Sequence, residues 1–316
     1  KHIIMKKLFI PFALVLLMFA SCGNDENENG EDNRTPGIID MTYMTADEVK
    51  AAIKADLDAG VKEFKLTGEF SKIGIPVEVS MLGIPDGNPF LNSNVEVIDL
   101  TGVTGWPLVN VDGRVDEKFN YLPGSVRGLP ARAFYGREYL DDVFHYYYPA
   151  LRAVKLQVEV KALGSFAFFA CQTLTTVSCS SVEDVGFQAL SGCPLLKTVE
   201  LPEAIRIHEG AFAFSGLVSL SLPKVTEING QAFQQCNNLT TLKLTAPGNL
   251  ALKINPSMGM PPFDGSNFAK ACHLTLNVDK HYDSGTATPK AESATTWYTP
   301  NEYSDAYTWK SITFFQ

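Results

Sequence analysis

The sequence predicts an α/β repeat fold, in which stacked units form a solenoid with a parallel sheet of short strands. The pattern Leu-x-x-(Val/Leu)-x-(Leu/Cys) occurs five times, and its first leucines are Leu151, Leu174, Leu196, Leu217 and Leu239. The steps between them are 23, 22, 21 and 22 residues, a period of about 22. The first four copies are each followed by a glycine with a nearby phenylalanine. A fixed period in this range is typical of solenoids, whose units cannot bury a core alone.

Each part of the unit has its own physical task. The apolar triplet is expected to form a strand, and a second apolar pair such as Val182 and Val185 follows it. Glycine suits a corner that needs a positive φ, and phenylalanine fills the interior. Three cysteines lie three residues before the next first leucine, and Phe214 is expected to take that place in the remaining unit. The glycines in question are Gly164, Gly186, Gly210 and Gly230, and the cysteines are Cys171, Cys193 and Cys236.

The stretch 231–244 carries a family resemblance. Its sequence, Gln-Ala-Phe-Gln-Gln-Cys-Asn-Asn-Leu-Thr-Thr-Leu-Lys-Leu, resembles the BspA-type leucine-rich repeat of bacterial surface proteins. The similarity is strong over 149–246 and weaker over 95–134 and 263–316. The resemblance implies a leucine-rich-repeat solenoid and adhesion to host or bacterial proteins.

The first 22 residues predict a lipoprotein signal peptide. A basic start at Lys6 and Lys7 precedes an apolar run, Leu8–Ala20, that is too short to span a membrane. Phe19–Cys22 resembles a lipobox, in which Cys22 becomes the lipidated first residue. The alternative is an ordinary secretory signal that happens to contain a cysteine.

Residues 23–39 are expected to form a flexible acidic tether, because they hold five acidic residues and few apolar ones. Acidic residues after a lipidated cysteine resemble the surface-export signal of Bacteroidetes lipoproteins. That resemblance implies a lipid anchor at the outer membrane, facing the cell exterior; a plain periplasmic linker is the alternative. Removal of residues 1–21, which carry three lysines and no acid, changes the formal charge from −9 to −12. Such a charge disfavours a nucleic-acid partner.

Residues 40–316 are expected to form one leucine-rich-repeat domain. Its N-terminal cap, 40–100, contains a helix from Met44 to Gly60, with Thr45 and Glu48 as a capping box, and two strands. Residues 101–148 form a repeat with insertions, and 149–246 form regular repeats. Residues 247–316 form a loop and a small C-terminal cap, with Trp309 in its core.

Two insertions, near 104–123 and 135–147, are rich in aromatic residues. Insertions in a solenoid emerge on a face or an edge, where exposed aromatics often mark recognition. They supply the candidate ligand-binding residues. The alternative is that the aromatics pack on each other and hold the insertions down. The candidates are Trp106, Tyr135, Tyr139, Phe144, His145, Tyr146 and Tyr147.

The sequence contains none of the common catalytic or phosphate-binding motifs, so no catalytic residue and no cofactor are expected. Asp141, Asp142 and His145 lie close together, but a solvated turn is favoured over a metal site. Asn110-x-Asp112-Gly113 lacks the remaining ligands of a calcium loop. The repeated cysteines are expected to be reduced core residues rather than a disulfide between neighbouring coils.

Three functions from different classes remain. The favoured one is a monomeric, surface-tethered and non-catalytic binding module that recognises an extracellular protein through the solenoid face and the aromatic insertions. Its only contact with the membrane would be the lipid anchor. The alternative is a glycan-binding accessory lipoprotein, in which Trp and Tyr side chains stack on sugar rings. An enzyme is the least favoured class, because no acid, base or nucleophile constellation is visible.

Overall fold

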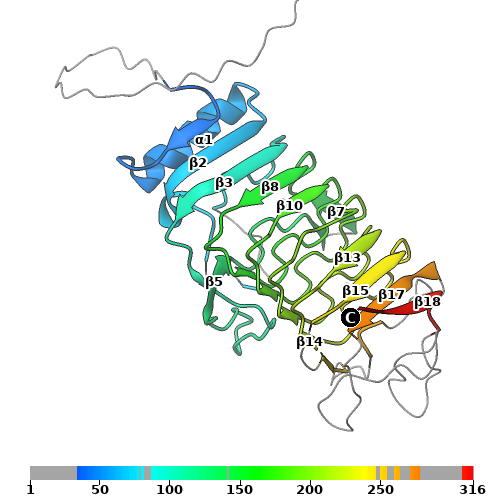
Figure 1. The fold of residues 1–316 in the computed structure, drawn as a ribbon. Coiled ribbons are helices and arrows are strands. Elements are labelled where there is room, and N and C mark those ends of the chain that lie inside the picture. Colours follow the sequence, from blue (N-terminus) through cyan, green and yellow to red (C-terminus); the bar gives the residue numbers. More distant parts are fainter. Residues whose placement is uncertain are drawn as a thin grey trace, which may run out of the picture. The chain divides into compact units, whose positions relative to one another are not determined.

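Stacked coils make up most of the unit Thr35–Gln316, which holds all of the described residues except Arg34 (Figure 1). The computed structural model describes residues 34–77, 80–81, 87–140, 142–246, 250–254, 260–263, 271–277 and 308–315. The expected signal peptide, Cys22 and most of the acidic tether therefore lie outside the described residues.

The first elements are strand β1 (Ile38–Asp40), helix α1 (Ala46–Asp58), strand β2 (Glu63–Glu69) and a short 3₁₀ helix, η1 (Phe70–Lys72). The predicted capping box is confirmed, because Thr45 and Glu48 exchange side-chain and backbone hydrogen bonds. Val49 and Ile53 on the apolar face of α1 are fully buried. Strand β1 begins inside the range expected to be tether, because Ile39 is buried beside β2.

One side of the stack carries parallel strands, which come from the N-terminal cap, from the apolar triplets of the repeats and from the C-terminal segments. Five of them form a sheet in the order β1-β2-β3-β8-β10, and four form a second one, β13-β15-β17-β18. The pairs Val154–Val177 and Leu220–Leu242 show the repeats in register. The new strands are β3 (Val97–Thr104), β8 (Ala153–Leu156), β10 (Thr176–Ser178), β13 (Ser219–Ser221), β15 (Thr241–Leu244), β17 (His273–Asn277) and β18 (Ser311–Phe315).

The expected continuous sheet is interrupted at the triplet of the third repeat. Thr198–Leu201 contributes an isolated bridge between Ser178 and Glu200 and no named strand. Val218 N–H still donates to Lys197 O at 2.8 Å, and beyond that bond the two segments separate. A groove of about 560 Å³ lies between them, lined on its two sides by Pro202 and Pro223.

A seven-stranded sheet that the sequence did not predict covers another side of the stack. The second apolar pairs form it, in the order β16-β14-β12-β11-β9-β5-β4. Its β16 lies within the segment expected to be a loop, because Ala251 and Leu252 pair with β14. The strands are β4 (Leu108–Val109), β5 (Val126–Leu129), β9 (Ala162–Leu163), β11 (Asp184–Val185), β12 (Arg206–Ile207), β14 (Glu227–Ile228) and β16 (Ala251–Leu252).

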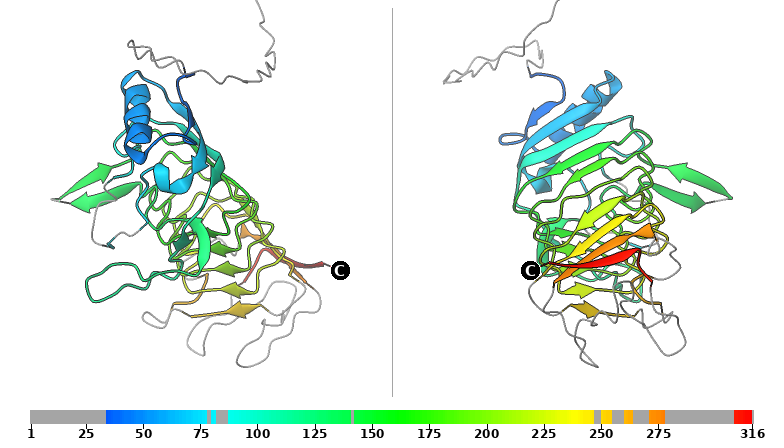
Figure 2. Two further views of the ribbon diagram at one scale, coloured as in Figure 1. Left: turned by 90° about the vertical axis from the view of Figure 1, so that its left-hand side faces the viewer. Right: turned by 45° about the vertical axis from the view of Figure 1, so that its right-hand side comes forward.

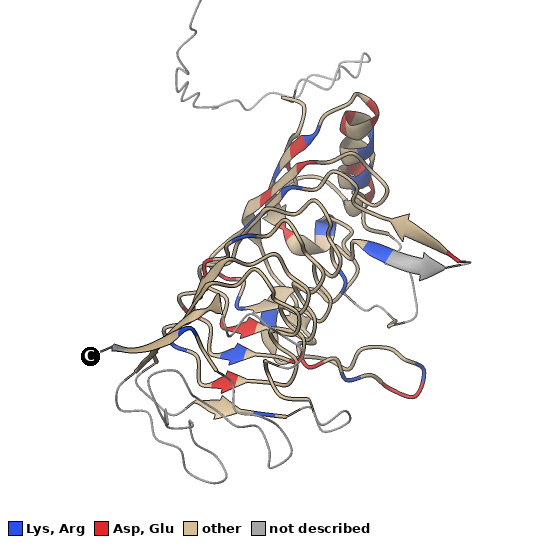
Figure 3. Ribbon diagram, turned by 90° about the vertical axis from the view of Figure 1, so that its right-hand side faces the viewer, with Lys and Arg blue, Asp and Glu red and all other residues tan. Residues whose placement is uncertain are grey.

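Charged residues alternate along this second sheet, as Figure 3 shows. Asp184 pairs in register with Arg206, which pairs in register with Glu227. The Asp184 side chain is buried, and one of its oxygens accepts a hydrogen bond from Arg206 at 2.6 Å. Burial raises the pKa of the Asp184 carboxyl, but hydrogen bonds from His208 and Arg206 outweigh that effect and hold the pKa below its usual value. The charges therefore tie neighbouring coils together.

Aromatic rings and thiols fill the centre of the coils. Phe134 stacks on Phe168, and Phe212, Phe233 and Phe263 stack in a column with centroids 5.5 and 5.6 Å apart. Trp309 packs edge-on against Phe263, which confirms its expected place in the core.

The repeated cysteines are buried free thiols, as expected. The Cys171 and Cys236 thiols donate to the carbonyls of Phe134 and Phe212 in the preceding coils, at 2.9 and 3.0 Å. Phe214 does not replace the cysteine of the shorter repeat, and that prediction was wrong. Ser215 occupies the position, with its hydroxyl 3.5 Å from the Cys236 sulfur. This repeat is one residue shorter because a single residue, Gly216, separates Ser215 from the next first leucine, whereas two residues follow each cysteine.

The role assigned to the repeat glycines was also partly wrong. Of the four, Gly210 alone has a positive φ, +61°. Gly164 and Gly186 are needed for space, because a Cβ at Gly186 would lie 2.3 Å from the Leu163 carbonyl oxygen of the preceding coil. In the other coils, the residue with positive φ at this corner carries a side chain. These residues are Arg132, Phe166, Gln188 and Gln231.

Candidate functional site

The insertion at 135–147 forms a β-hairpin that projects from the stack of coils (Figure 2). Its strands are β6 (Arg137–Leu140) and β7 (Val143–Tyr146), which pair antiparallel and belong to none of the other three sheets. The base is fixed, because Tyr147 N–H donates to Gly136 O at 2.9 Å and Gly136 N–H donates to Phe169 O at 2.6 Å. The hairpin is therefore anchored to the coils at its base.

The hairpin exposes apolar side chains. Val143 is 56 % exposed, and Phe144 and Tyr146 are each 48 % exposed. The Arg137 guanidinium lies 4.4 Å from the centre of the Phe144 ring, in a cation–π arrangement. Phe144 and Tyr146 lie two residues apart in one strand and so share a face of the hairpin. Tyr139 pairs with Phe144 in the strand register, but its side chain lies outside the described residues.

Three of the candidate residues are core residues and not surface residues. Trp106 is fully buried, with its indole N–H donating to Val103 O at 2.9 Å and its ring 5.0 Å from Phe70. Tyr135 stacks on Phe169, and Tyr147 is 4 % exposed. The expectation that they are exposed is wrong, because Trp106 packs on Phe70 of the N-terminal cap, Tyr135 packs on a coil aromatic, and Tyr147 lies where the chain rejoins the coil. His145, Phe144 and Tyr146 are exposed, as expected.

The other insertion is held down by one buried amide. Asn110 donates to the carbonyls of Arg114 and Leu122, and its side-chain oxygen accepts from Gly113 N–H and from the Ser165 hydroxyl. This network accounts for the Asn-x-Asp-Gly sequence without a metal ion. In the part of the chain that the structure describes, no three His, Cys, Asp or Glu side chains gather as metal ligands. Asp141, one of the three residues considered for a metal, lies outside that part.

A groove of about 410 Å³ lies beside the hairpin, and no sequence pattern indicated it. It crosses the corners of successive coils, and Arg137 of the hairpin lies along it. Its lining also includes Phe169, Gln188, Glu209, Phe214 and Gln234.

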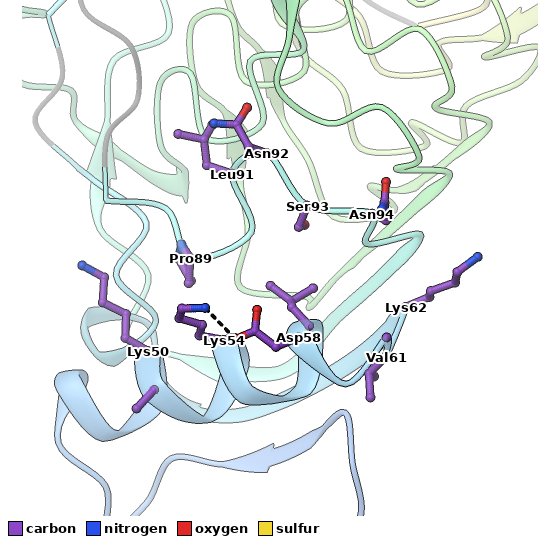
Figure 4. A pocket seen from close by; sticks show the side chains of 13 residues that line it. Lys50, Lys54, Asp58, Val61, Lys62, Pro89, Leu91, Asn92, Ser93 and Asn94 are labelled. Carbon is purple, nitrogen blue, oxygen red and sulfur yellow. Dashed lines mark hydrogen bonds and ion pairs between the residues drawn. The ribbon is translucent and has the colours of Figure 1, made fainter.

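A cleft of about 670 Å³ separates α1 from the segment 89–94 (Figure 4). Lys50, Lys54 and Lys62 lie along it. Lys54 pairs with Asp58 of the same helix at 2.6 Å, and Lys62 pairs with Glu96 at 2.9 Å. Two of the three ammonium groups are thus balanced by carboxylates, so this cleft has no strong positive charge to attract an anion.

Comparison with known proteins agrees with the repeat spacing. Residues 137–251 match the model of the BspA type leucine rich repeat region, in six copies. The fold is of the leucine-rich-repeat type, with parallel sheets and few helices. The matched range includes the hairpin and all five of the leucine anchors. No curated protein matches the chain.

Three solved structures share limited similarity with the chain. A leucine-rich repeat protein from Bacteroides ovatus is 20 % identical, over 65 % of this chain and 55 % of that one, with a TM-score of 0.31. The pneumococcal vaccine antigen PcpA is 14 % identical, over 59 % and 55 %, with a TM-score of 0.27. A leucine rich cell surface protein from Faecalibacterium prausnitzii is 19 % identical, over 47 % and 52 %, with a TM-score of 0.20. The match spans about half the length of each of these proteins.

Among the helices of the described residues, none has the length and apolar character that a membrane crossing requires.

Proposed function

We propose that this protein is a surface-displayed, non-catalytic binding module that recognises an extracellular protein, in the manner of an adhesin. The observation that carries the proposal is the hairpin 137–146, which holds exposed Phe144 and Tyr146 away from the stack. Exposed aromatic residues on a rigid support are typical anchors of protein interfaces, because they bury a large area at a small cost in side-chain entropy.

The N-terminal sequence supports display at the surface. Cys22 in its lipobox-like context, followed by the acidic tether, would anchor the mature chain at the outer membrane with the solenoid facing outward. Radiolabelled palmitate should be incorporated into the parent and not into Cys22→Ala. Protease added to intact cells should remove the anchored protein; survival of the protein in intact cells would place it on the inner side of the membrane.

The hairpin proposal is tested with the chain from Thr35 onward, which forms one unit. Parent and Phe144→Ser/Tyr146→Ser are compared for binding to an array of purified extracellular-matrix and plasma proteins, with Tyr43→Ser as the matched control. Tyr43 is 98 % exposed and lies before α1, away from the hairpin sequence. We expect one or more array proteins to bind the parent and the control equally, and the double variant at least tenfold more weakly. Equal binding by the double variant contradicts the proposal.

The glycan-binding alternative loses Trp106 as a stacking residue because that side chain is buried, whereas Tyr146 is exposed. A different surface, the groove beside the hairpin, also has side chains that suit a glycan.

A further inference from the structure

The groove beside the hairpin, defined by Arg137, Phe169, Gln188, Glu209, Phe214 and Gln234, is shaped by strained backbone at the coil corners. Phe214 has a φ of +56° and is 55 % exposed. Ala170 and Gln235 have the same φ of +56° at this corner of other coils, so the repeat sets the backbone angle and the choice of phenylalanine is particular to this coil. The same corner holds Ala170 and Gly192 in the two preceding coils, so the fold does not require an aromatic residue there.

The backbone along the groove is already used in pairing coil to coil. Amide N–H groups of one coil donate to carbonyls of the next, at 2.8 or 2.9 Å. The bonds run from Gln188, Leu190 and Gly192 to Glu209, Ala211 and Ala213, and from Phe212 and Phe214 to Ala232 and Gln234. An extended peptide that binds by strand addition needs an unpaired backbone edge. Recognition in this groove must therefore come from side chains.

The side chains are those that suit a polyhydroxylated ligand. Glutamine amides both donate and accept hydrogen bonds, as sugar hydroxyls do. Within the described residues, the Gln188 amide makes no hydrogen bond, although it lies half-buried in the groove. The Glu209 carboxyl adds acceptors and the Arg137 guanidinium adds donors. Burial raises the pKa of Glu209, in keeping with an enclosed position.

Two phenylalanines supply the apolar platforms. Phe169 rests on Tyr135, with ring centroids 5.2 Å apart and nearly parallel planes, so its ring is held rigidly. Phe214 stands two coils further along the groove. The C–H faces of sugar rings pack on such aromatic surfaces. The groove crosses four coils, a span of about 14 Å at roughly 4.8 Å per coil, which accommodates a short oligosaccharide segment.

We propose that this groove is an oligosaccharide-binding site, with Phe169 and Phe214 as stacking platforms and Gln188 as a hydrogen-bonding residue. The site goes beyond the proposed protein recognition, because it uses a different surface and needs no protein partner. It shares only its border, Arg137, with the hairpin.

The test uses Phe214→Gly, because glycine is what the preceding coil carries at this corner, as Gly192. The chain from Thr35 onward is applied to an array of immobilised oligosaccharides, and hits are titrated in solution by calorimetry. We expect the parent to bind at least one oligosaccharide saturably. Phe214→Gly should lower that affinity at least tenfold while the midpoint of thermal unfolding changes little, because the strain that glycine relieves offsets part of the packing lost from the buried portion of the ring. Loss of affinity through damage to the fold would instead lower the midpoint sharply.

Gln235→Gly is the matched control. Gln235 has the same φ of +56° one coil further on, and it is not among the groove residues. It should leave the oligosaccharide affinity within twofold of the parent, whereas Gln188→Ala should weaken it several-fold. Absence of binding to every arrayed oligosaccharide overturns the proposal, and so does unchanged affinity in Phe214→Gly. A peptide that binds in a Phe214-dependent manner while no oligosaccharide does so would also overturn it.

The two proposals fail separately. Tyr146→Ser leaves Phe144 beneath Arg137 and should not alter oligosaccharide affinity, while Phe214→Gly should not alter binding of the hairpin to a protein. An effect of Tyr146→Ser on both ligands would merge the two surfaces into one site and so contradict a separate groove.

Discussion

Gly186→Ala should destabilise the protein through the spacing of the coils. Gly186 N–H donates to Leu163 O at 2.9 Å, and an added Cβ would lie 2.3 Å from that same oxygen. The obstacle is backbone, so two coils must move apart. Overpacking of this kind costs about 1–3 kcal/mol, and weakening the hydrogen bond adds about 1 kcal/mol. We therefore expect a loss of about 2–4 kcal/mol in the free energy of unfolding.

Gly210→Gln is the matched substitution. Gly210 has a φ of +61°, and an added Cβ would meet only the flexible side chain of Gln188, at 2.9 Å. The neighbouring coils hold Gln188 and Gln231 at this corner with φ of 49° and 57°. The left-handed conformation costs about 1 kcal/mol, and the smaller entropy of the unfolded chain offsets about half of it. The net loss should be below about 1 kcal/mol.

Urea denaturation of the two variants, followed by circular dichroism, measures both free energies from the midpoints and slopes. If positive φ were the reason for both glycines, Gly186→Ala and Gly210→Gln would lose similar stability. A loss at Gly210→Gln equal to or larger than that at Gly186→Ala would refute the distinction between a glycine kept for space and a glycine kept for conformation.

Three further predictions concern single side chains. Thr45→Ala removes the cap of α1 and should lower the unfolding free energy by about 1 kcal/mol in urea. Burial raises the pKa of Cys193 to about 12 and of Cys236 to about 11. The two thiols should therefore resist iodoacetamide in the native protein and react only after unfolding. Mass spectrometry can count the alkylated cysteines in each state. Asp184→Asn should lower the free energy of unfolding by about 1–2 kcal/mol. The loss is smaller than for a fully buried ion pair because the partner, Arg206, is partly exposed to solvent. Since the folded pKa of Asp184 is lowered from 3.8, the advantage of the parent over Asp184→Asn should be full above about pH 5 and shrink below about pH 4, as melts across this range would show.

Much of the fold could be predicted from the sequence where one physical cause dominates. The spacing of leucines specified the strands of the first side, because buried apolar residues must recur once per coil. The capping box at Thr45 was a local signal with a local cause. Trp309 was placed in the core because the pattern around it resembles the final strand that closes such domains, and the residue is buried.

The second sheet was missed because its strands are too short to show a period. β11 and β12 contain two residues each, so no alternation can be read from them. The place of Phe214 was misjudged for a related reason. Counting back from Leu217 assumes a constant spacing, but the shortened repeat lost its residue between Ser215 and Leu217. Gly216 there lies against the coil before it, where a Cβ would approach Pro194 O to 1.9 Å.

The aromatic candidates could not be sorted from sequence, because an insertion has a base and a tip that differ in burial. Residues at the base continue the coil and pack on its aromatics, as Tyr135 does on Phe169. Phe144 and Tyr146 stand on the hairpin strand β7 and reach solvent, although Tyr146 pairs with Arg137 directly beside the base. A sequence pattern marks where the repeat is broken, but whether a side chain packs on the coil or stands on the hairpin decides whether it can meet a ligand.

Phe144 and Phe214 are the two phenylalanines that best separate structural need from function. The core phenylalanines stabilise the fold by stacking in the column that contains Phe212 and Phe233. Phe144 and Phe214 are about half exposed, and Phe214 also holds a strained backbone angle. Neither exposure nor strain adds to stability. Substitutions at these two positions should therefore separate binding from folding more cleanly than substitutions at any of the buried aromatics, and a large loss of affinity with little change in the thermal midpoint of Phe214→Gly would demonstrate that separation.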